Sequence, residues 1–134
     1  MDLFKSKQTL SKTDRKMNLY KSVGDFRSII ERERARADRT NQKFTLIIFE
    51  VGFNNKYDFS LIMELFELIN TRIRITDEVG WFSVKSIGAL LTDTDEEGAY
   101  KFIEDLKNKF SSESQFPPYI IYIYPSINWQ KDLE

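Results

Sequence analysis

The first half of the chain shows a helical pattern followed by an uninterrupted apolar run. From Met17 to Arg39, apolar residues recur at helical spacing between charged ones, which predicts an amphipathic helix interrupted near Gly24. The run from Phe44 to Val51 is rich in β-branched and aromatic residues and apolar on both faces, which predicts a buried central strand. A helix that leads into a central strand therefore opens the domain.

The middle of the chain predicts a second helix and a hairpin. We expect a turn over residues 52–56, followed by a broadly buried helix from Phe59 to Ile73. Two short strand patterns then follow, Ile75 to Ser83 and Ser86 to Thr92, and the two residues between them are typical of a hairpin turn.

The last part of the pattern predicts one more helix and one more strand. Asp93, Thr94 or Asp95 can cap a helix whose apolar face runs over residues 99–110. The run from Tyr119 to Tyr124 predicts a strand that stops at the following proline.

The order of elements after the first helix is therefore βαββαβ. This is the ferredoxin-like α+β pattern, in which two helices cover one face of a four-stranded antiparallel sheet. We expect a flexible lead over residues 1–16, one domain over residues 17–126 and a frayed tail over residues 127–134. Chain length agrees with this division, because 134 residues suffice for a single hydrophobic core.

Composition removes several classes of function. The chain has no Cys and no His, which excludes disulfides, thiolate chemistry, His-based triads and the usual zinc ligands. A net charge of -1 argues against a broad nucleic-acid footprint. No apolar run is long enough to insert into a membrane and the N-terminus lacks a secretory pattern, so we expect a cytoplasmic protein.

Two stretches of the chain resemble the GGDEF (diguanylate cyclase) domain. Residues 26–51 combine an Arg-rich helix with a strand, and Glu50 falls where the family carries an Asp. In residues 74–99, Arg74 and Asp77 match the family's RxxD motif, and a strand ending in two leucines follows at the expected distance. The resemblance implies a GGDEF-like fold.

The signature of that family is replaced in this chain. The five positions that would carry it are Ser83, Val84, Lys85, Ser86 and Ile87. Active relatives hold divalent metal on clustered carboxylates and bring a glycine-rich hairpin close to the nucleotide, whereas here Glu50 is followed by Gly52 at the next acidic position. We therefore expect no catalytic residues, no metal and no cofactor, and an active nucleotidyl cyclase is the hypothesis that the sequence favours least.

The RxxD motif leaves two alternatives open. In the family this motif binds cyclic di-GMP, so the resemblance implies a ligand site at Arg74 and Asp77, with Arg72 as a second cation. The alternative is structural: Asp77 caps or pairs at the turn before a strand, and Arg74 is its solvated ion-pair partner.

The predicted function is a catalytically inactive regulatory module that acts through protein contacts. A protein partner or a second copy would bind through the charged N-terminal helix, and a purely structural or dimerisation role is the alternative. The aromatic residues Trp81, Tyr124 and Trp129 either mark a partner surface or pack at the core. The phrases DEVGWF, LLTDT and IYPS are similar to those of short degenerate GGDEF proteins associated with bacterial exopolysaccharide biosynthesis.

Overall fold

A four-stranded antiparallel sheet forms the centre of the protein. The computed structural model describes residues 20–53, 56–111 and 115–125, so the predicted lead, the predicted tail and Trp129 lie outside the described residues. The strand order is β4-β5-β1-β6, and their bounds are β1 Phe44–Glu50, β4 Glu78–Ser83, β5 Ser86–Thr92 and β6 Tyr119–Tyr124. This order confirms the α+β fold predicted from the sequence.

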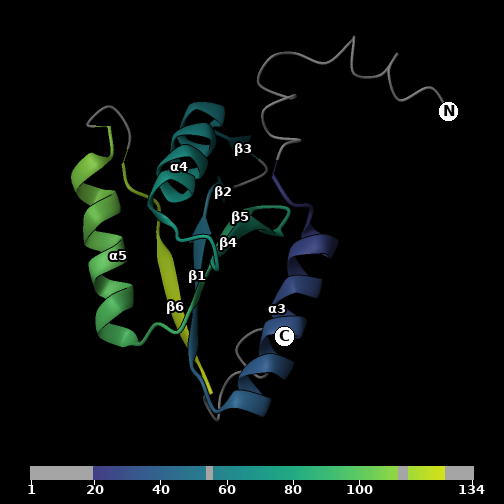
Figure 1. Cartoon of the computed structure of the whole chain (residues 1–134). Coiled ribbons are helices and arrows are strands. Elements are labelled where there is room, and N and C mark those ends of the chain that lie inside the picture. Colours follow the sequence, from purple (N-terminus) through teal and green to yellow (C-terminus); the bar gives the residue numbers. More distant parts are fainter. Residues whose placement is uncertain (1–19, 54–55, 112–114, 126–134) are drawn as a thin grey trace, which may run out of the picture.

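Helices cover both faces of this sheet. Helices α4 (Phe59–Arg72) and α5 (Glu96–Lys109) lie on one face, as predicted, and α3 (Val23–Thr40) lies on the other (Figure 1). Alternate residues of β1 point into the two layers, because successive side chains of a strand face opposite sides. Ile47 belongs to the α4/α5 cluster and Leu46 to the α3 cluster. This double burial explains why the predicted central strand is apolar on both of its faces.

Helix α3 starts later than its sequence pattern predicts. The side chain of Ser22 accepts a hydrogen bond from the backbone N–H of Asp25, so Ser22 caps the helix and Gly24 lies in its first turn. Tyr20, which the helical pattern included, precedes the helix and stacks on Phe66 of α4, with ring centroids 3.9 Å apart. The spacing of Tyr20 was therefore misleading, because its partner lies on the opposite face of the sheet from α3.

Two other predicted bounds differ from the structure. The strand predicted to start at Ile75 starts at Glu78, since residues 74–77 form a turn in which Ile75 is 99% exposed. The turn predicted over residues 52–56 contains two short paired strands, β2 (Gly52–Phe53) and β3 (Lys56–Tyr57). Both differences depend on local backbone hydrogen bonds, within the 74–77 turn and between β2 and β3, which cannot be inferred from hydrophobic periodicity.

Helix α3 packs on the sheet through the ring of Phe26, which lies directly over two glycines. Gly80 of β4 and Gly88 of β5 are direct partners in the ladder. A Cβ atom at Gly88 would lie 2.5 Å from Cε2 of Phe26, and one at Gly80 would lie 2.9 Å from Cδ1 of the same ring. Phe26 is fully buried at this position. The absence of two side chains thus makes the hollow that receives the helix.

Two of the aromatic residues singled out in the sequence pack against the core. The Trp81 ring meets Phe66 edge-on at 5.3 Å, and Tyr124 stacks on Phe44 at 5.1 Å. The Tyr124 hydroxyl donates to Asp38 at 2.5 Å, and this bond, with burial as the next cause, raises the pKa of Tyr124. These contacts favour packing over a partner surface for both residues. Across the described residues, no helix has the length and apolar character needed to span a bilayer.

Replacing Gly88 by Ala should destabilise the fold. The new methyl group would overlap the Phe26 ring, and overpacking of this kind costs about 1–3 kcal/mol. Thermal or urea unfolding measures the effect. Gly24→Ala is the matched control: no heavy atom lies within 4 Å of its Cβ position, and the change should leave stability the same or raise it by up to about 1 kcal/mol. Equal stability of Gly88→Ala and wild type would contradict the proposed docking.

Candidate anion-binding site

The carboxylate of Asp77 holds together the turn before β4 and the end of β5. Its Oδ1 accepts from the backbone N–H of Thr92 at 2.9 Å and from the Thr92 hydroxyl at 3.1 Å. Its Oδ2 accepts from the backbone N–H of Arg74 at 2.9 Å. The side chain is only 3% exposed. A carboxylate buried this deeply needs such partners, since an unsatisfied one would be costly.

The guanidinium of Arg74 completes this network. Nε donates to Asp77 Oδ2 at 3.2 Å and Nη2 donates to Asp77 Oδ1 at 3.3 Å. Nη2 also donates to the Thr92 carbonyl and, at 3.1 Å, to the Thr94 hydroxyl. Nη1 makes no hydrogen bond with the described residues, and the side chain is 53% exposed. One edge of the guanidinium is therefore fixed and the other faces outward.

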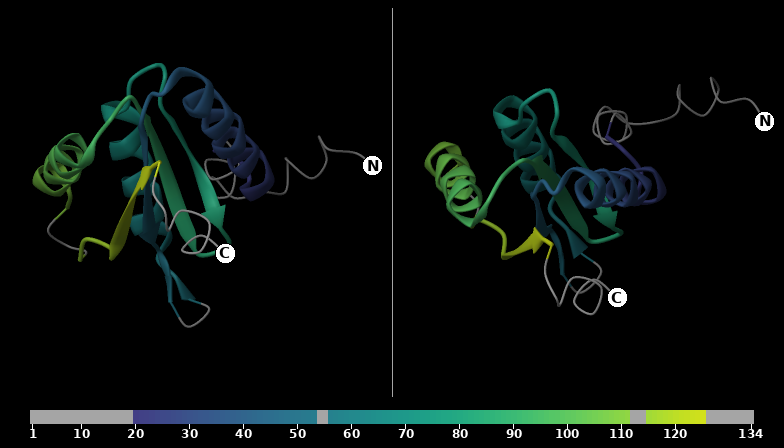
Figure 2. Two further views of the ribbon diagram at one scale, coloured as in Figure 1. Left: turned by 90° about the horizontal axis from the view of Figure 1, so that it is seen from below. Right: turned by 60° about the horizontal axis from the view of Figure 1, so that its bottom comes forward.

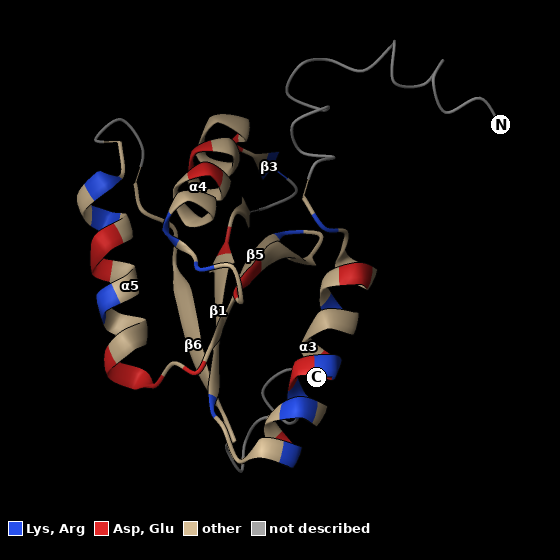
Figure 3. Ribbon diagram, in the orientation of Figure 1, with Lys and Arg blue, Asp and Glu red and all other residues tan. Residues whose placement is uncertain are grey.

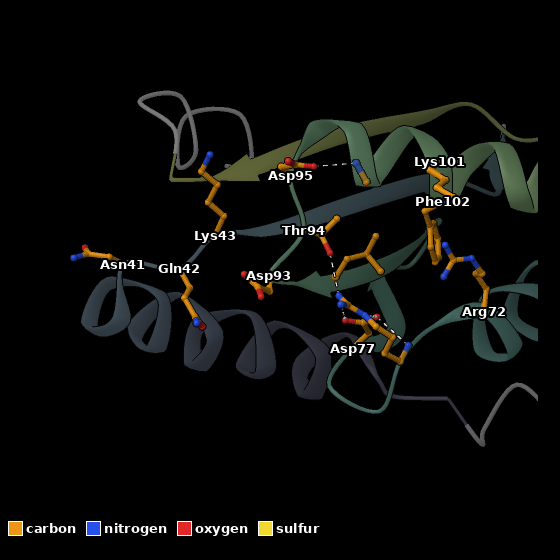
Figure 4. Close-up of a pocket in the computed structure, with 13 residues that line it drawn as sticks. Asn41, Gln42, Lys43, Arg72, Asp77, Asp93, Thr94, Asp95, Lys101 and Phe102 are labelled. Carbon is orange, nitrogen blue, oxygen red and sulfur yellow. Dashed lines mark hydrogen bonds and ion pairs between the residues drawn. The ribbon is translucent and has the colours of Figure 1, made fainter.

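A cavity of about 560 Å³ opens beside Arg74 (Figure 4). Its walls come from the segment after α3, the ends of α4 and β5, and the first turns of α5. Arg72 lies in the wall, where Nε donates to Asp105 at 2.9 Å and the guanidinium lies 5.4 Å from the centre of the Phe102 ring. Lys43 and Lys101 also line the cavity. The two arginines proposed from sequence thus border one space.

Two of the three acidic side chains that line this cavity already accept hydrogen bonds within the chain. Asp77 is paired with Arg74, and Asp95 caps α5 by accepting from the backbone N–H of Gly98 at 3.0 Å. Asp93 remains, in a left-handed backbone conformation with φ of 51°. The lining thus carries four cationic side chains, Lys43, Arg72, Arg74 and Lys101, against three carboxylates, and its net positive charge favours an anion.

The opposite end of the sheet has a different character. The Lys85 carbonyl at the β4–β5 turn accepts from the backbone N–H groups of Val51 at 2.9 Å and Gly52 at 3.0 Å. A Cβ atom at Gly52 would lie 2.8 Å from the Lys85 Cβ, so the hairpin tip is pressed against the end of β1. Within the turn, the Ser83 and Ser86 hydroxyls lie 2.5 Å apart.

Comparison with solved structures identifies the architecture. A DGC protein from Thermotoga maritima superposes with a TM-score of 0.66 at 19% identity, over 80% of this chain and 83% of that one. Diguanylate cyclase SiaD from Pseudomonas aeruginosa, in complex with its activator SiaC, gives 0.65 at 15% identity, over 98% of this chain and 57% of that one. The GGDEF domain of DgcB from Caulobacter crescentus, in complex with c-di-GMP, gives 0.60 at 9% identity, over 78% and 71%.

This chain has the GGDEF-domain fold. No protein-family model and no curated protein sequence matches it. At such low identity the likeness is one of fold alone, so function has to be argued from the residues.

Within the GGDEF fold, the structure separates the sequence-predicted residues into two groups. Arg72, Arg74 and Asp77 lie together at the Thr92 end of β5. Glu50, Gly52 and the five signature positions, residues 83–87, lie together at the Ser86 end. The described residues contain no group of three or more Asp, Glu, His or Cys side chains able to hold a metal ion.

Several residues of the GGDEF-fold cavity were not predicted from sequence. Thr92 and Thr94 bond to the Arg74–Asp77 pair, and Lys43 and Lys101 line the wall. The two threonines follow a predicted strand, but their closeness to Arg74 depends on the register that places Glu78 opposite Leu90. The lysines had no sequence signal, since exposed Lys residues occur throughout the chain.

Replacing Asp77 by Asn should destabilise the protein strongly. The amide has one acceptor oxygen, so its NH₂ group would face N–H donors of Arg74 or Thr92, and losing hydrogen bonds to a buried charge costs about 1.5–3 kcal/mol. Chemical denaturation measures this loss. Asp93→Asn makes the same chemical change at a second wall residue outside the network and should alter stability by less than about 0.5 kcal/mol. Equal losses of stability in the two variants would contradict the conclusion that the Asp77 carboxylate holds the 74–77 turn to the end of β5.

Proposed function

We propose that this chain is a catalytically inactive GGDEF-fold regulatory module, which binds cyclic di-GMP beside Arg74 and acts through protein contacts. One observation carries the proposal: Arg74 is fixed along one edge by a buried carboxylate, its Nη1 makes no hydrogen bond with the described residues, and the side chain lines a cavity with more cationic than acidic groups. On the similarity of the phrases DEVGWF, LLTDT and IYPS, we place this regulation in bacterial exopolysaccharide production.

The chemistry of the cavity favours a cyclic dinucleotide among anions. Guanidinium groups pair with phosphodiester oxygens and with the acceptor edge of guanine. Arg74 offers Nη1 and Arg72 offers the donors that Asp105 does not engage. The Phe102 ring adds an apolar surface in the same wall. A planar base together with a phosphate would use all three features.

In this proposal Asp77 is a positioning residue. Both of its oxygens accept hydrogen bonds within the chain, and its side chain is buried. It therefore holds Arg74 toward the cavity and does not contact guanine directly. This assigns the two RxxD residues different roles, one exposed and one internal.

Two features support the proposed lack of cyclase activity. Glu50 is the one carboxylate of β1, and the hairpin tip beside it presents Lys85, which repels divalent metal. The backbone of that tip bonds to Val51 and Gly52, where a nucleotide would need to approach. A cavity of about 850 Å³ borders Glu50 and Gly52, but the described residues contain no cluster of three acidic side chains there to hold a metal ion.

The proposed protein contact surface is the outer face of α3. Acidic and basic residues are interspersed along this helix (Figure 3). Several pair within the helix, such as Arg36 with Glu33 at 2.6 Å, and that hydrogen bond is the main cause that raises the pKa of Arg36. The SiaD structure, a diguanylate cyclase bound to its activator, and the DgcB structure, bound to c-di-GMP, support both kinds of partner for this fold.

A purely structural or dimerisation module is the second candidate. The observation in its favour is that the Arg74–Asp77 pair joins the 74–77 turn to β5, which is a structural role without any ligand. This candidate predicts no nucleotide binding.

Calorimetric titration of cyclic di-GMP distinguishes the two candidates. We expect binding by the wild type that is weakened at least about tenfold in Arg72→Ala and Arg74→Ala, because loss of one charged hydrogen-bonding group costs about 1.5–3 kcal/mol. Arg72→Ala is the cleaner variant, since the pair it breaks is partly exposed and contributes little to stability. Arg32→Ala, on the exposed part of α3, is the matched control and should bind like wild type. Absence of heat with wild type would support the structural candidate.

Incubation with GTP and Mg²⁺ or Mn²⁺ should yield no cyclic di-GMP. The reason is that Glu50 is the single carboxylate of β1 and that the described residues hold no cluster of three acidic side chains for a metal ion. Product analysis by chromatography provides the measurement, with Glu50→Ala as the comparison. Turnover by wild type that disappears in Glu50→Ala would overturn the proposed inactivity.

A further inference from the structure

The two edge strands of the sheet, β4 and β6, differ in whether their outer backbone groups are paired. At the β4 edge, Lys21 forms a parallel bridge with Gly80, and its carbonyl accepts from the Trp81 N–H at 3.0 Å. At the opposite edge, β6 is the outermost strand, and no described strand pairs with its outer side (Figure 2). One edge is therefore covered by the chain itself and the other is left open by the described residues.

The open edge lacks the devices that normally prevent strand pairing. Natural edge strands carry Lys, Pro or bulges that block a second chain. Strand β6 consists only of Tyr and Ile, and its pairing with β1 runs without a bulge. Ile120 is 49% exposed on this strand. Pro118 and Pro125 stand just outside the strand and bound it.

The ladder with β1 decides which backbone groups of β6 point outward. The Glu50 N–H donates to the Pro118 carbonyl at 2.9 Å, at the position where the β1–β6 register makes these two residues opposite. In an antiparallel pair, residues alternate between bonding inward and bonding outward. The even-numbered residues of β6 therefore bond to β1. The N–H and C=O groups of Tyr119, Ile121 and Ile123 point away from the sheet.

We propose that this edge pairs with the same edge of a second copy, antiparallel, about a two-fold axis at Ile121. This register sets Ile121 opposite Ile121 of the second copy and Tyr119 opposite Ile123, so every outward group finds a partner. The next registers that pair outward residues lie two residues away in either direction. They set Ile123 opposite Pro117 or Tyr119 opposite Pro125, and proline has no N–H to donate. The flanking prolines thus select one register.

The side chains of this register are compatible with pairing. A two-fold axis perpendicular to the sheet keeps the α4/α5 face on the same side in both copies. The cross-strand pairs are Ile with Ile and Tyr with Ile, which stabilise antiparallel ladders, and no like charges meet. The result is one continuous sheet through both copies, formed by strand addition.

This dimer surface is separate from both surfaces of the proposed function. No β6 residue is among the described residues that line the cavity at Arg74, and α3 packs mainly against β4, at the opposite edge of the sheet from the outward groups of β6. Failure of the dimer proposal therefore leaves nucleotide binding untouched, and the reverse also holds.

Sedimentation of the full chain over a range of concentrations tests the proposal. Wild type should show a monomer–dimer equilibrium. Ile121→Pro removes an outward N–H without removing a bond to β1, and it should weaken dimerisation at least about tenfold, since one bond is lost from each copy. Ile75→Pro is the matched control: it sits at the second position of the 74–77 turn, where proline is favoured, and should dimerise like wild type.

Amide hydrogen exchange on the wild type decides the matter if Ile121→Pro does not fold. The N–H groups of Ile121 and Ile123 should become more protected as concentration rises, while that of Ile120 should already be protected in the monomer. A protein that stays monomeric at every concentration overturns the proposal. So does a dimer that folded Ile121→Pro leaves intact, or exchange at Ile121 that does not change with concentration.

Discussion

A single buried carboxylate determines how this protein presents its charge. Asp77 is enclosed at the point where the chain leaves α4 and enters the sheet, and a charge in that position is tolerated only when its oxygens are fully bonded. Meeting this requirement ties the 74–77 turn to the end of β5 and leaves the Arg74 guanidinium with one fixed edge. The same bonds that stabilise the turn therefore organise the wall of the cavity.

The two ends of the sheet offer different groups to a ligand. At the Thr92 end, four cationic and three acidic side chains line a cavity of about 560 Å³. At the Ser86 end, the hairpin tip bonds directly to the end of β1 and carries Lys85. The Thr92 end therefore offers a cavity with a net positive lining, whereas the described residues at the Ser86 end offer no metal-binding cluster. This contrast is the physical basis for proposing a receptor in place of an enzyme.

Much of the fold could be predicted from sequence because most elements have one clear period. The residues of β1 are apolar on both faces, and the structure buries them between two helical layers. Prediction failed where a local hydrogen bond or a long-range contact decides the outcome. Ile75 reads as strand yet lies in the turn held by Asp77, and Tyr20 reads as helix yet stacks on Phe66. The packing of Phe26 over Gly80 and Gly88 could not be predicted from sequence, because it depends on which residues face each other across the β4–β5 ladder.

The candidate site was predictable in part for the same reason. Arg74 and Asp77 were found through a short motif, but Thr92 and Thr94 join them only through the hairpin register.

The most direct test of the receptor account is nuclear magnetic resonance of nitrogen-labelled arginine side chains during titration with cyclic di-GMP. The account predicts that the Nε–H signals of Arg72 and Arg74 shift together and saturate, while that of Arg32 does not move. Signals of Arg72 and Arg74 that stay in place at saturating ligand would contradict it.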